Sequence, residues 1–260
     1  MTGPTENTPS LWLGHWPTPH ADSHKYQRGH AVLFAAPELT GATRLAAAAA
    51  LRVGPGLVSV LAKERGDVYR ATLSPEVMVS ERSVKGLNGV SALLGGPGGL
   101  AHEHLLELEG SDLPKVVDSG ALASPCGRLH YNAQTVITPH AGEFARAFPE
   151  IVSSSQSRER QALAAAAHSG AVLVYKGPVT FIVAPDGRLV RNGRPNPHLA
   201  VAGSGDVLAG FIVGLLAQGM DPFWAACAGV WLHSECGERA GRGLIAGDLI
   251  LALPKVIRAL

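Results

Sequence analysis

The chain has 260 residues, of which 46% are hydrophobic and 17% charged, and its formal net charge is +1. This near-neutral balance excludes a broad basic surface for nucleic acid or anionic lipid, and the hydrophobic content excludes intrinsic disorder. A folded chain of this length buries about 70–75% of its unfolded surface, so the fold needs neither disulfides nor a structural metal.

No segment has the pattern of a secretory leader or a membrane span. Residues 1–22 are rich in Pro and Trp but lack the basic and apolar regions of a signal peptide. The longest uncharged apolar stretch, 207–220, is shorter than the roughly 20 residues that a spanning helix needs. Cys126, Cys227 and Cys236 are an odd number without close pairing, which is typical of reduced thiols. We therefore expect a cytoplasmic protein without a membrane anchor.

In chain order, an extended arm (1–22) precedes one α/β domain (23–260) in which apolar runs alternate with helical patterns. Strands are predicted at 31–36, 57–62, 89–96, 115–119, 135–138 and 171–177. Helices are predicted at 41–52, 100–109, 142–148, 156–168, 206–218, 222–240 and 248–260. Continuous apolar strands separated by helices indicate a mostly parallel sheet with helices on both faces. Residues 180–191 contain a Pro-Asp-Gly turn between two short β-type runs, which predicts an antiparallel hairpin at the sheet edge.

The most informative motif is the turn Gly203-Ser204-Gly205-Asp206, which directly precedes a strongly apolar helix. Backbone N–H groups at such a helix start form an anion hole suited to phosphate. Asp206 has two possible roles. It can cap the helix, as Asp often does in the first turn. It can also act as the general base that takes a proton from an alcohol attacking phosphorus.

Two further polar segments follow predicted strands, at the sheet edge where ligands bind in parallel α/β folds. Lys176 and Gly177 follow one strand with a cation and a flexible residue, and the hydroxyl of Thr180 comes shortly after them. His140 follows the strand 135–138, with Glu143 nearby. A histidine in this position is either a ligand contact or a structural residue bonded to the backbone.

Together these segments resemble the ribokinase-like superfamily and, within it, the ADP/ATP-dependent NAD(P)H-hydrate dehydratases. The resemblance runs from about residue 24 to the last helix. The matching segments are HKY (24–26), GA (41–42), PEVM (75–78), GPG (96–98), VD (117–118), TPHAGE (138–143), KG (176–177) and GSGDVLAG (203–210), followed by QG (218–219) and His233. Their order and spacing are more specific than any one of them.

The resemblance implies a three-layer ribokinase-like domain that restores NADH or NADPH from the (6S) hydrate. ADP or ATP would phosphorylate the ring hydroxyl with Mg²⁺ present, and AMP or ADP and phosphate would be released. Asp206 would be the catalytic base, and the N–H groups of Gly203, Ser204 and Gly205 would stabilise the phosphoryl charge. The nucleotide contacts would be Lys176, Gly177, Pro178, Val179, Thr180 and Gly205, and the hydrate contacts Ala42, Gly98, His140 and Asp206. The resemblance also implies a homotetramer and a separate NAD(P)H-hydrate epimerase.

Three departures from the family pattern concern the hydrate side. Gly120 stands where the family has a second Asp, Leu39-Thr40 replaces a Tyr, and Gly99-Leu100 inverts the usual Leu-Gly order. Three alternative functions remain open at this point. One is a kinase of the same superfamily acting on a hydroxymethylpyrimidine or thiazole alcohol. The others are a nucleotide-binding regulator without catalysis and a hydride-transferring dehydrogenase.

Overall fold

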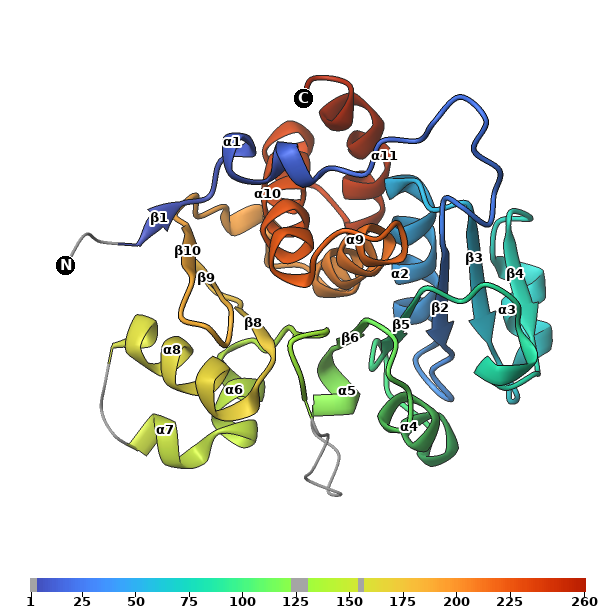
Figure 1. Cartoon of the computed structure of the whole chain (residues 1–260), viewed down its shortest axis with the longest axis horizontal. Helices are drawn as coiled ribbons and strands as arrows, with labels where there is room; N and C mark the ends of the chain where they lie inside the picture. Colours follow the sequence, from blue (N-terminus) through green and yellow to red (C-terminus); the bar gives the residue numbers. More distant parts are fainter. Residues whose placement is uncertain (1–3, 123–130, 154–156) are drawn as a thin grey trace.

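The computed structural model of the chain describes residues 4–122, 131–153 and 157–260 (Figure 1). Its strands are β1 (Thr5–Glu6), β2 (His30–Phe34), β3 (Leu57–Leu61), β4 (Val77–Ser80), β5 (Ala92–Gly95), β6 (Lys115–Val117), β7 (Thr135–Ile137), β8 (Val172–Tyr175), β9 (Thr180–Val183) and β10 (Leu189–Asn192). Its α-helices are α1 (Pro9–Trp12), α2 (Thr40–Val53), α3 (Gly66–Thr72), α4 (His102–Glu109), α5 (Ser119–Leu122), α6 (Ala141–Ala147), α7 (Pro149–Ser153), α8 (Arg158–Ser169), α9 (Ser204–Ala217), α10 (Pro222–Ala240) and α11 (Ala246–Ile257).

The described strands form one sheet in the order β1-β10-β9-β8-β7-β6-β5-β2-β3-β4. Strand β9 pairs antiparallel with both of its neighbours, while all the other pairs are parallel. The mostly parallel sheet and the β9–β10 hairpin are therefore confirmed. The hairpin is not the edge of the sheet, however, because β1 pairs with β10 on its outer side.

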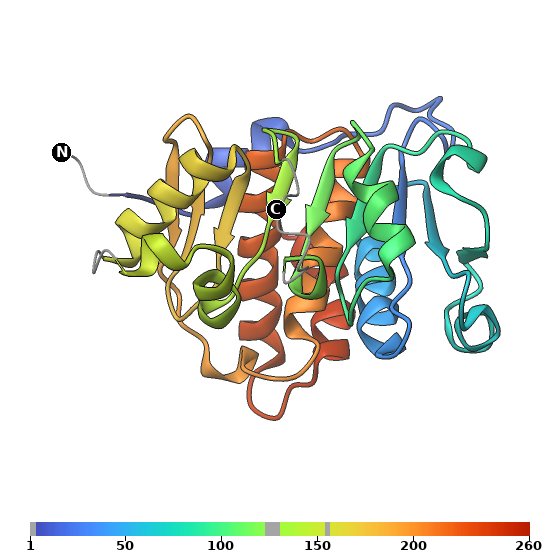
Figure 2. The same ribbon diagram turned by 90° about the horizontal axis from the view of Figure 1, so that it is seen from below.

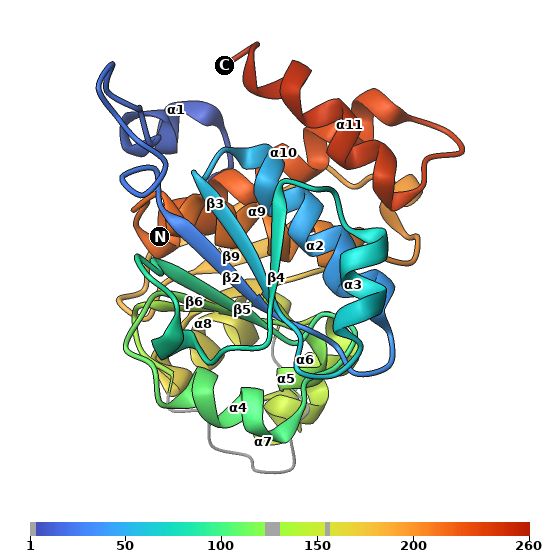
Figure 3. The same cartoon turned by 90° about the vertical axis from the view of Figure 1, so that its right-hand side faces the viewer.

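Helices cover both faces of the sheet, which gives the expected three layers. In Figures 1 and 3, α2, α9, α10 and α11 lie on one side of the strands and α4, α6 and α7 on the other. Figure 2 shows the green and yellow helices in front of the strands and the orange and red helices behind them. Successive residues of β2 alternate between two separate cores: Leu33 packs in the one beneath α2 and α9, and Phe34 in the one beneath α4 and α6. This alternation is why the strand is apolar throughout.

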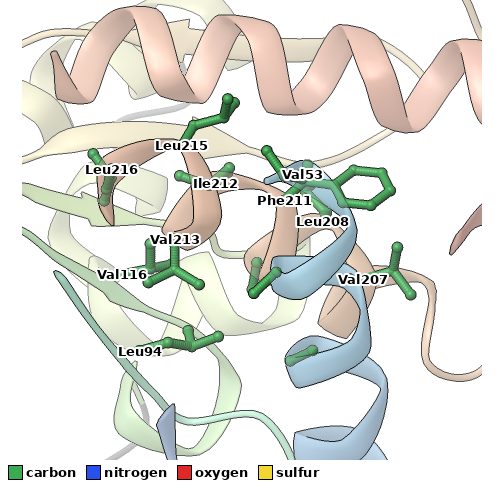
Figure 4. Close-up of a cluster of buried hydrophobic side chains, with 14 of the residues drawn as sticks. Val53, Leu94, Val116, Val207, Leu208, Phe211, Ile212, Val213, Leu215 and Leu216 are labelled. Atoms are coloured by element: carbon green, nitrogen blue, oxygen red, sulfur yellow. The ribbon is translucent and has the colours of Figure 1, made fainter. Parts of the chain in front are cut away.

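The larger core is centred on α9, which is buried along nearly its whole length (Figure 4). It packs against α2 without room for side chains at two positions. A Cβ on Gly210 would lie 2.4 Å from the Ala46 carbonyl oxygen, and a Cβ on Gly214 would lie 2.8 Å from that of Ala50. Such close backbone approach requires glycine and alanine. It also holds the N-terminal end of α9 at a set position over the sheet.

The N-terminal segment differs from the expected extended arm, because it is part of the folded domain. Trp12 is fully buried, and its ring lies 5.7 Å from the rings of both Trp16 and Trp231. The Asn7 side-chain amide donates to the Cys227 carbonyl oxygen at 2.8 Å. The segment lacks periodicity because its residues contact different elements: β1 pairs with β10, whereas Asn7 and Trp12 contact α10.

Six short elements, β1, α1, α3, β4, α5 and α7, were not predicted, and several boundaries differ by one to three residues. Short elements carry too few residues for a periodic pattern to stand out. Cys227 and Cys236 are buried free thiols, as expected, and burial raises the pKa of Cys236 to about 12. Cys126 lies outside the described residues. In the part of the chain that the structure describes, no helix is long and apolar enough to cross a membrane.

Candidate active site

The predicted polar residues gather at one edge of the sheet because their strands run parallel. Asp118, His140 and Lys176 follow β6, β7 and β8, which are neighbours in the sheet. After β2 the chain builds β3 and β4 on one side and then returns to β5 on the other. The loops after β2 and β5 thus flank the switch point of the strand order, where ligands bind in open α/β sheets. Ala42 and Gly98 lie in the segments that follow these two strands.

The glycine-rich turn begins α9, with Gly203 as the residue before the helix at φ +86°. A Cβ on Gly203 would also lie 2.5 Å from the Leu45 side chain, so glycine is required on two grounds. The Ser204 N–H donates to the Val201 carbonyl oxygen at 3.3 Å. Within the described residues, the N–H groups of Gly205 and Asp206 have no acceptor. These two amides, rather than that of Ser204, are free for an anion.

Asp206 stands in the first turn of α9 and is partly buried. Its carboxylate accepts no hydrogen bond from any described residue, so it does not cap the helix through its side chain. Burial and the nearby charge of Asp118 raise the pKa of Asp206 to about 6, although Lys176 acts in the opposite direction. A carboxylate with such a pKa is ionised at neutral pH and still accepts a proton readily, which suits a general base.

Lys176 connects Asp206 to two other acids. Its ammonium donates to Asp118 Oδ1 at 3.0 Å and lies 3.9 Å from Glu143 Oε2. Burial lowers the pKa of Lys176, but the charges of these two carboxylates outweigh it and the pKa is raised. Thr138 Oγ1 donates to the same Asp118 oxygen at 2.6 Å. The result is a charged lysine held above the turn, 3.3 Å from where a Cβ on Gly205 would lie.

A cavity of about 720 Å³ opens beside this cluster. Five of the predicted site residues line it near the sheet edge: His140, Lys176, Gly177, Pro178 and Thr180. Ser204 and Gly205 line it at the start of α9, whereas Val179, Gly203 and Asp206 are not among its lining residues. The far wall is more apolar and includes Leu199, Leu208 and Val230. A cavity with cations and free amides at one end and an apolar wall at the other fits a nucleotide.

His140 has the second of its two predicted roles, because its side chain is bonded to the backbone. It also lines the cavity. Its Nδ1 accepts hydrogen bonds from the N–H groups of Gly142 at 3.0 Å and Glu143 at 3.3 Å, while Glu143 accepts from the His140 N–H at 2.9 Å. These reciprocal bonds form a capping box at the start of α6. Because Nδ1 is an acceptor, we assign the ring proton to Nε2. The side chain is 57% exposed, and its Nε2 lies 3.3 Å from Glu143 Oε1.

The two predicted hydrate-side positions, Ala42 and Gly98, lie against each other. A Cβ on Gly98 would be 2.9 Å from the Ala42 Cβ and 2.4 Å from the Leu39 carbonyl oxygen. Gly98 also has φ +78°, so glycine is required by both space and backbone conformation. Neither residue lines the large cavity. They follow β2 and β5, whereas Lys176 follows β8, so Asp118 after β6 lies between them and Lys176 in the strand order.

The departure at Gly120 has a steric reason. A Cβ on Gly120 would lie 2.7 Å from the Gly99 Cα. Gly99, the first residue of the inverted pair, thus lies against Gly120, and a larger side chain at position 120 would displace this backbone. The two departures are therefore linked through one contact, which neither of them reveals alone in the sequence.

Several residues that the sequence prediction missed belong to the site. Asp118 was quoted only as part of a motif, yet it is 2% exposed and binds Lys176. His233 Nε2 lies 3.0 Å from the Ser204 carbonyl oxygen and 2.9 Å from its Oγ. Burial lowers the pKa of His233 to about 4, so its ring is neutral at physiological pH. Arg194 and Asn196 line the cavity from the segment after β10. A polar residue directly after an apolar strand was the signal for Asp118, and His233 was among the residues that match the family pattern. Neither Arg194 nor Asn196 was given a role.

The chain matches a family model described as NAD(P)H-hydrate dehydratase over residues 31–257. It is 35% identical to the bifunctional NAD(P)H-hydrate repair enzyme Nnr of Moorella thermoacetica, over 94% of this chain and 52% of that protein. It is 34% identical to the ADP-dependent (S)-NAD(P)H-hydrate dehydratase of Neisseria meningitidis, over 88% of this chain and 84% of that one. The chain thus spans about half the length of the bifunctional relatives it matches.

The fold is similar to that of the ADP/ATP-dependent NAD(P)H-hydrate dehydratase from Bacillus subtilis, which was co-crystallised with ATP/Mg²⁺. The two structures superpose with a TM-score of 0.84 at 28% sequence identity. The match covers 100% of this chain and 99% of the Bacillus chain.

Proposed function

The chain belongs to the NAD(P)H-hydrate dehydratase family, and we propose that it converts the (6S) hydrates of NADH and NADPH back to the intact cofactors. ADP or ATP is the phosphoryl donor, and AMP or ADP is released with phosphate. The observation that carries this proposal is the position of Asp206. It is a partly buried carboxylate without a hydrogen-bond partner among the described residues, it stands in the helix turn that has the free amides, and Lys176 is close enough to lower its pKa.

The first step is phosphoryl transfer to the ring hydroxyl of the hydrate. Asp206 accepts the hydroxyl proton as the oxygen bonds to the terminal phosphorus, and the bond from phosphorus to the departing nucleotide breaks. The N–H groups of Gly205 and Asp206, together with the Lys176 ammonium, balance the charge on the phosphoryl oxygens. Phosphorylation matters because hydroxide is a poor leaving group and phosphate is a good one.

The second step is elimination. The carbon–oxygen bond breaks, and phosphate leaves with the electron pair while the ring nitrogen donates its lone pair. Loss of a proton from the adjacent ring carbon then forms the double bond of the dihydropyridine. In sum, hydrate and ADP become reduced cofactor, AMP and phosphate. We place the hydrate ring at the switch point beside Ala42 and Gly98, two small residues that lie against each other there.

We propose that the nucleotide occupies the 720 Å³ cavity with its phosphates near Lys176 and its base along the apolar wall. Among the described residues, no group of three or more His, Cys, Asp or Glu side chains is arranged to hold a metal ion. We propose that magnesium enters with the nucleotide co-substrate, where it neutralises phosphate charge.

The proposed setting is the cytoplasm, where the buried thiols Cys227 and Cys236 stay reduced. A separate epimerase would supply the (6S) form from the other hydrate epimer. We also propose a homotetramer, as the family resemblance implies. Analytical ultracentrifugation of the purified protein tests this assembly, and a single monomeric species would refute it.

The test is a repair assay on the purified (6S) hydrates of NADH and NADPH, with ADP and ATP in parallel. Return of the near-ultraviolet absorbance of reduced nicotinamide, matched by equal amounts of released phosphate, is the expected result. A stable phosphorylated product without absorbance recovery would identify a kinase instead. Nucleotide binding without turnover of either hydrate would identify a regulator, and absorbance change with NAD and simple alcohols a dehydrogenase.

A further inference from the structure

Arg158 is the first residue of α8, and its side chain reaches under the loop between β8 and β9. Its guanidinium donates to the carbonyl oxygens of Val179 at 2.9 Å and Lys176 at 2.8 Å, with a longer bond of 3.4 Å to that of Tyr175. The same group stacks over the Tyr175 ring, 4.2 Å from its centroid. One planar side chain therefore holds both ends of the loop that carries the proposed nucleotide contacts.

The backbone groups of this loop are divided in a way that favours an anion. The carbonyl oxygens of Lys176 and Val179 accept from Arg158, as does that of Tyr175 at the end of β8, and the Gly177 carbonyl accepts from the Thr180 hydroxyl at 3.3 Å. Of the loop N–H groups, that of Lys176 donates to the Pro139 carbonyl oxygen at 2.9 Å. Pro178 has none, and within the described residues those of Gly177 and Val179 have no acceptor. Since Gly177 and Thr180 line the cavity, the loop offers unpaired donors to whatever binds there.

The glycine at position 177 is required by Arg158 and not by its backbone angles. A Cβ on Gly177 would lie 2.5 and 2.6 Å from the two terminal guanidinium nitrogens and 2.8 Å from Cζ. Its φ is outside the left-handed region, so another residue type would meet no backbone strain there. Arg158 and Gly177 are thus a matched pair: the small residue admits the guanidinium, and the guanidinium sets the shape of the loop.

We propose that Arg158 is a positioning residue for the nucleotide. By engaging the loop carbonyls it keeps the Gly177 and Val179 amides unpaired and holds the Lys176 backbone so that its ammonium lies against Asp118. Arg158 itself does not line the cavity. Without it, the loop carbonyls would have to find other donors, and the loop would change shape. This inference rests on the proposed function, because it assigns the loop to an adenine nucleotide.

The test compares R158M and R158K with wild type by calorimetric titration of ADP and by steady-state kinetics. For R158M we expect a loss of ADP affinity of about 10- to 100-fold, the range expected when hydrogen bonds from a charged donor are removed. The KM for ADP should rise in parallel, while kcat at saturating ADP and the KM for the hydrate should change by less than about threefold. R158K should recover part of the affinity, because an ammonium replaces the charge but not the planar fork.

A double-mutant cycle with G177A separates this idea from a direct steric role of Gly177 at the ligand. In wild type, the added methyl group displaces the guanidinium and should weaken ADP binding about tenfold. In the R158A background the same change should cost less than about twofold. Equal costs in the two backgrounds would overturn the proposal.

Arg160, exposed on the same helix, provides the matched control. R160M should bind ADP as wild type does. Failure of wild type itself to bind ADP would remove the proposed function, whatever the Arg158 variants do. Wild-type binding with unchanged affinity in R158M, or in R158K should R158M not fold, would overturn the inference alone.

Discussion

The substitution Asp206→Asn tests catalysis and electrostatics together, because the same carboxylate is the proposed base and an unfavourably placed charge. Removing a general base slows the reaction by typically 10²- to 10⁴-fold, so we expect kcat to fall about 10³-fold. ADP affinity should change little, since the cavity is lined by other residues.

In wild type, kcat/KM should fall about tenfold for each pH unit below 6, as Asp206 becomes protonated with its pKa of about 6.

Asp206→Asn should stabilise the folded protein, whereas most substitutions lower its stability. The folded state raises the pKa of Asp206 from 3.8 to about 6, so the folded protein binds this proton more tightly than the unfolded chain does. The ionised carboxylate therefore destabilises the fold, and the penalty is fully present above about pH 6. Asp206→Asn should raise the melting temperature at pH 7 to 8. This gain should disappear below about pH 4, where the acid is protonated in both states.

Asp248 provides the matched control, because it occupies the equivalent third position of α11. Its Oδ2 accepts from the Ile245 N–H at 2.8 Å, a capping bond that Asp206 does not make. Asp248→Asn should lower the melting temperature and leave turnover unchanged. The assays are the repair reaction across pH and thermal unfolding by calorimetry. Wild-type turnover in Asp206→Asn, or a lower melting temperature at pH 7, would refute the reasoning about this carboxylate.

Three further predictions follow from contacts around the site. Lys176→Gln removes a cation that lowers the pKa of Asp206, so the fall of kcat/KM at acid pH should begin at a higher pH. If that fall stays at the same pH, a group other than Asp206 causes it. Asn7→Leu breaks the bonds to the Cys227 carbonyl and the Asn192 side chain behind the cavity wall, and titration should show ADP binding weakened about three- to tenfold. Gly210→Ala should lower the free energy of unfolding by about 1–3 kcal/mol in urea, whereas Gly247→Ala, which meets open space, should not.

The sequence predicted the strands and long helices well because those patterns are local. Continuous apolar runs such as that of β2 identify strands buried on both faces, and the glycines of the 203–206 turn identify the start of a helix. The order of strands and helices then indicated a parallel sheet, which implied that residues after different strands meet at one edge. The position of Lys176 and His140 on that edge needed no tertiary information.

Only the tertiary structure decided which of these residues touch. Lys176 and Asp118 are 58 positions apart, and their ion pair depends on β8 and β6 lying two strands from each other in the sheet. The N-terminal segment has no pattern of its own, yet Trp12 is fully buried because α10 supplies the surface that covers it. Arg158 has the sequence context of an ordinary first-turn helix residue. Local propensity and hydrophobic alternation are properties of neighbouring residues, whereas the pairing of charges and the raised pKa of Asp206 arise from burial among groups brought together by folding.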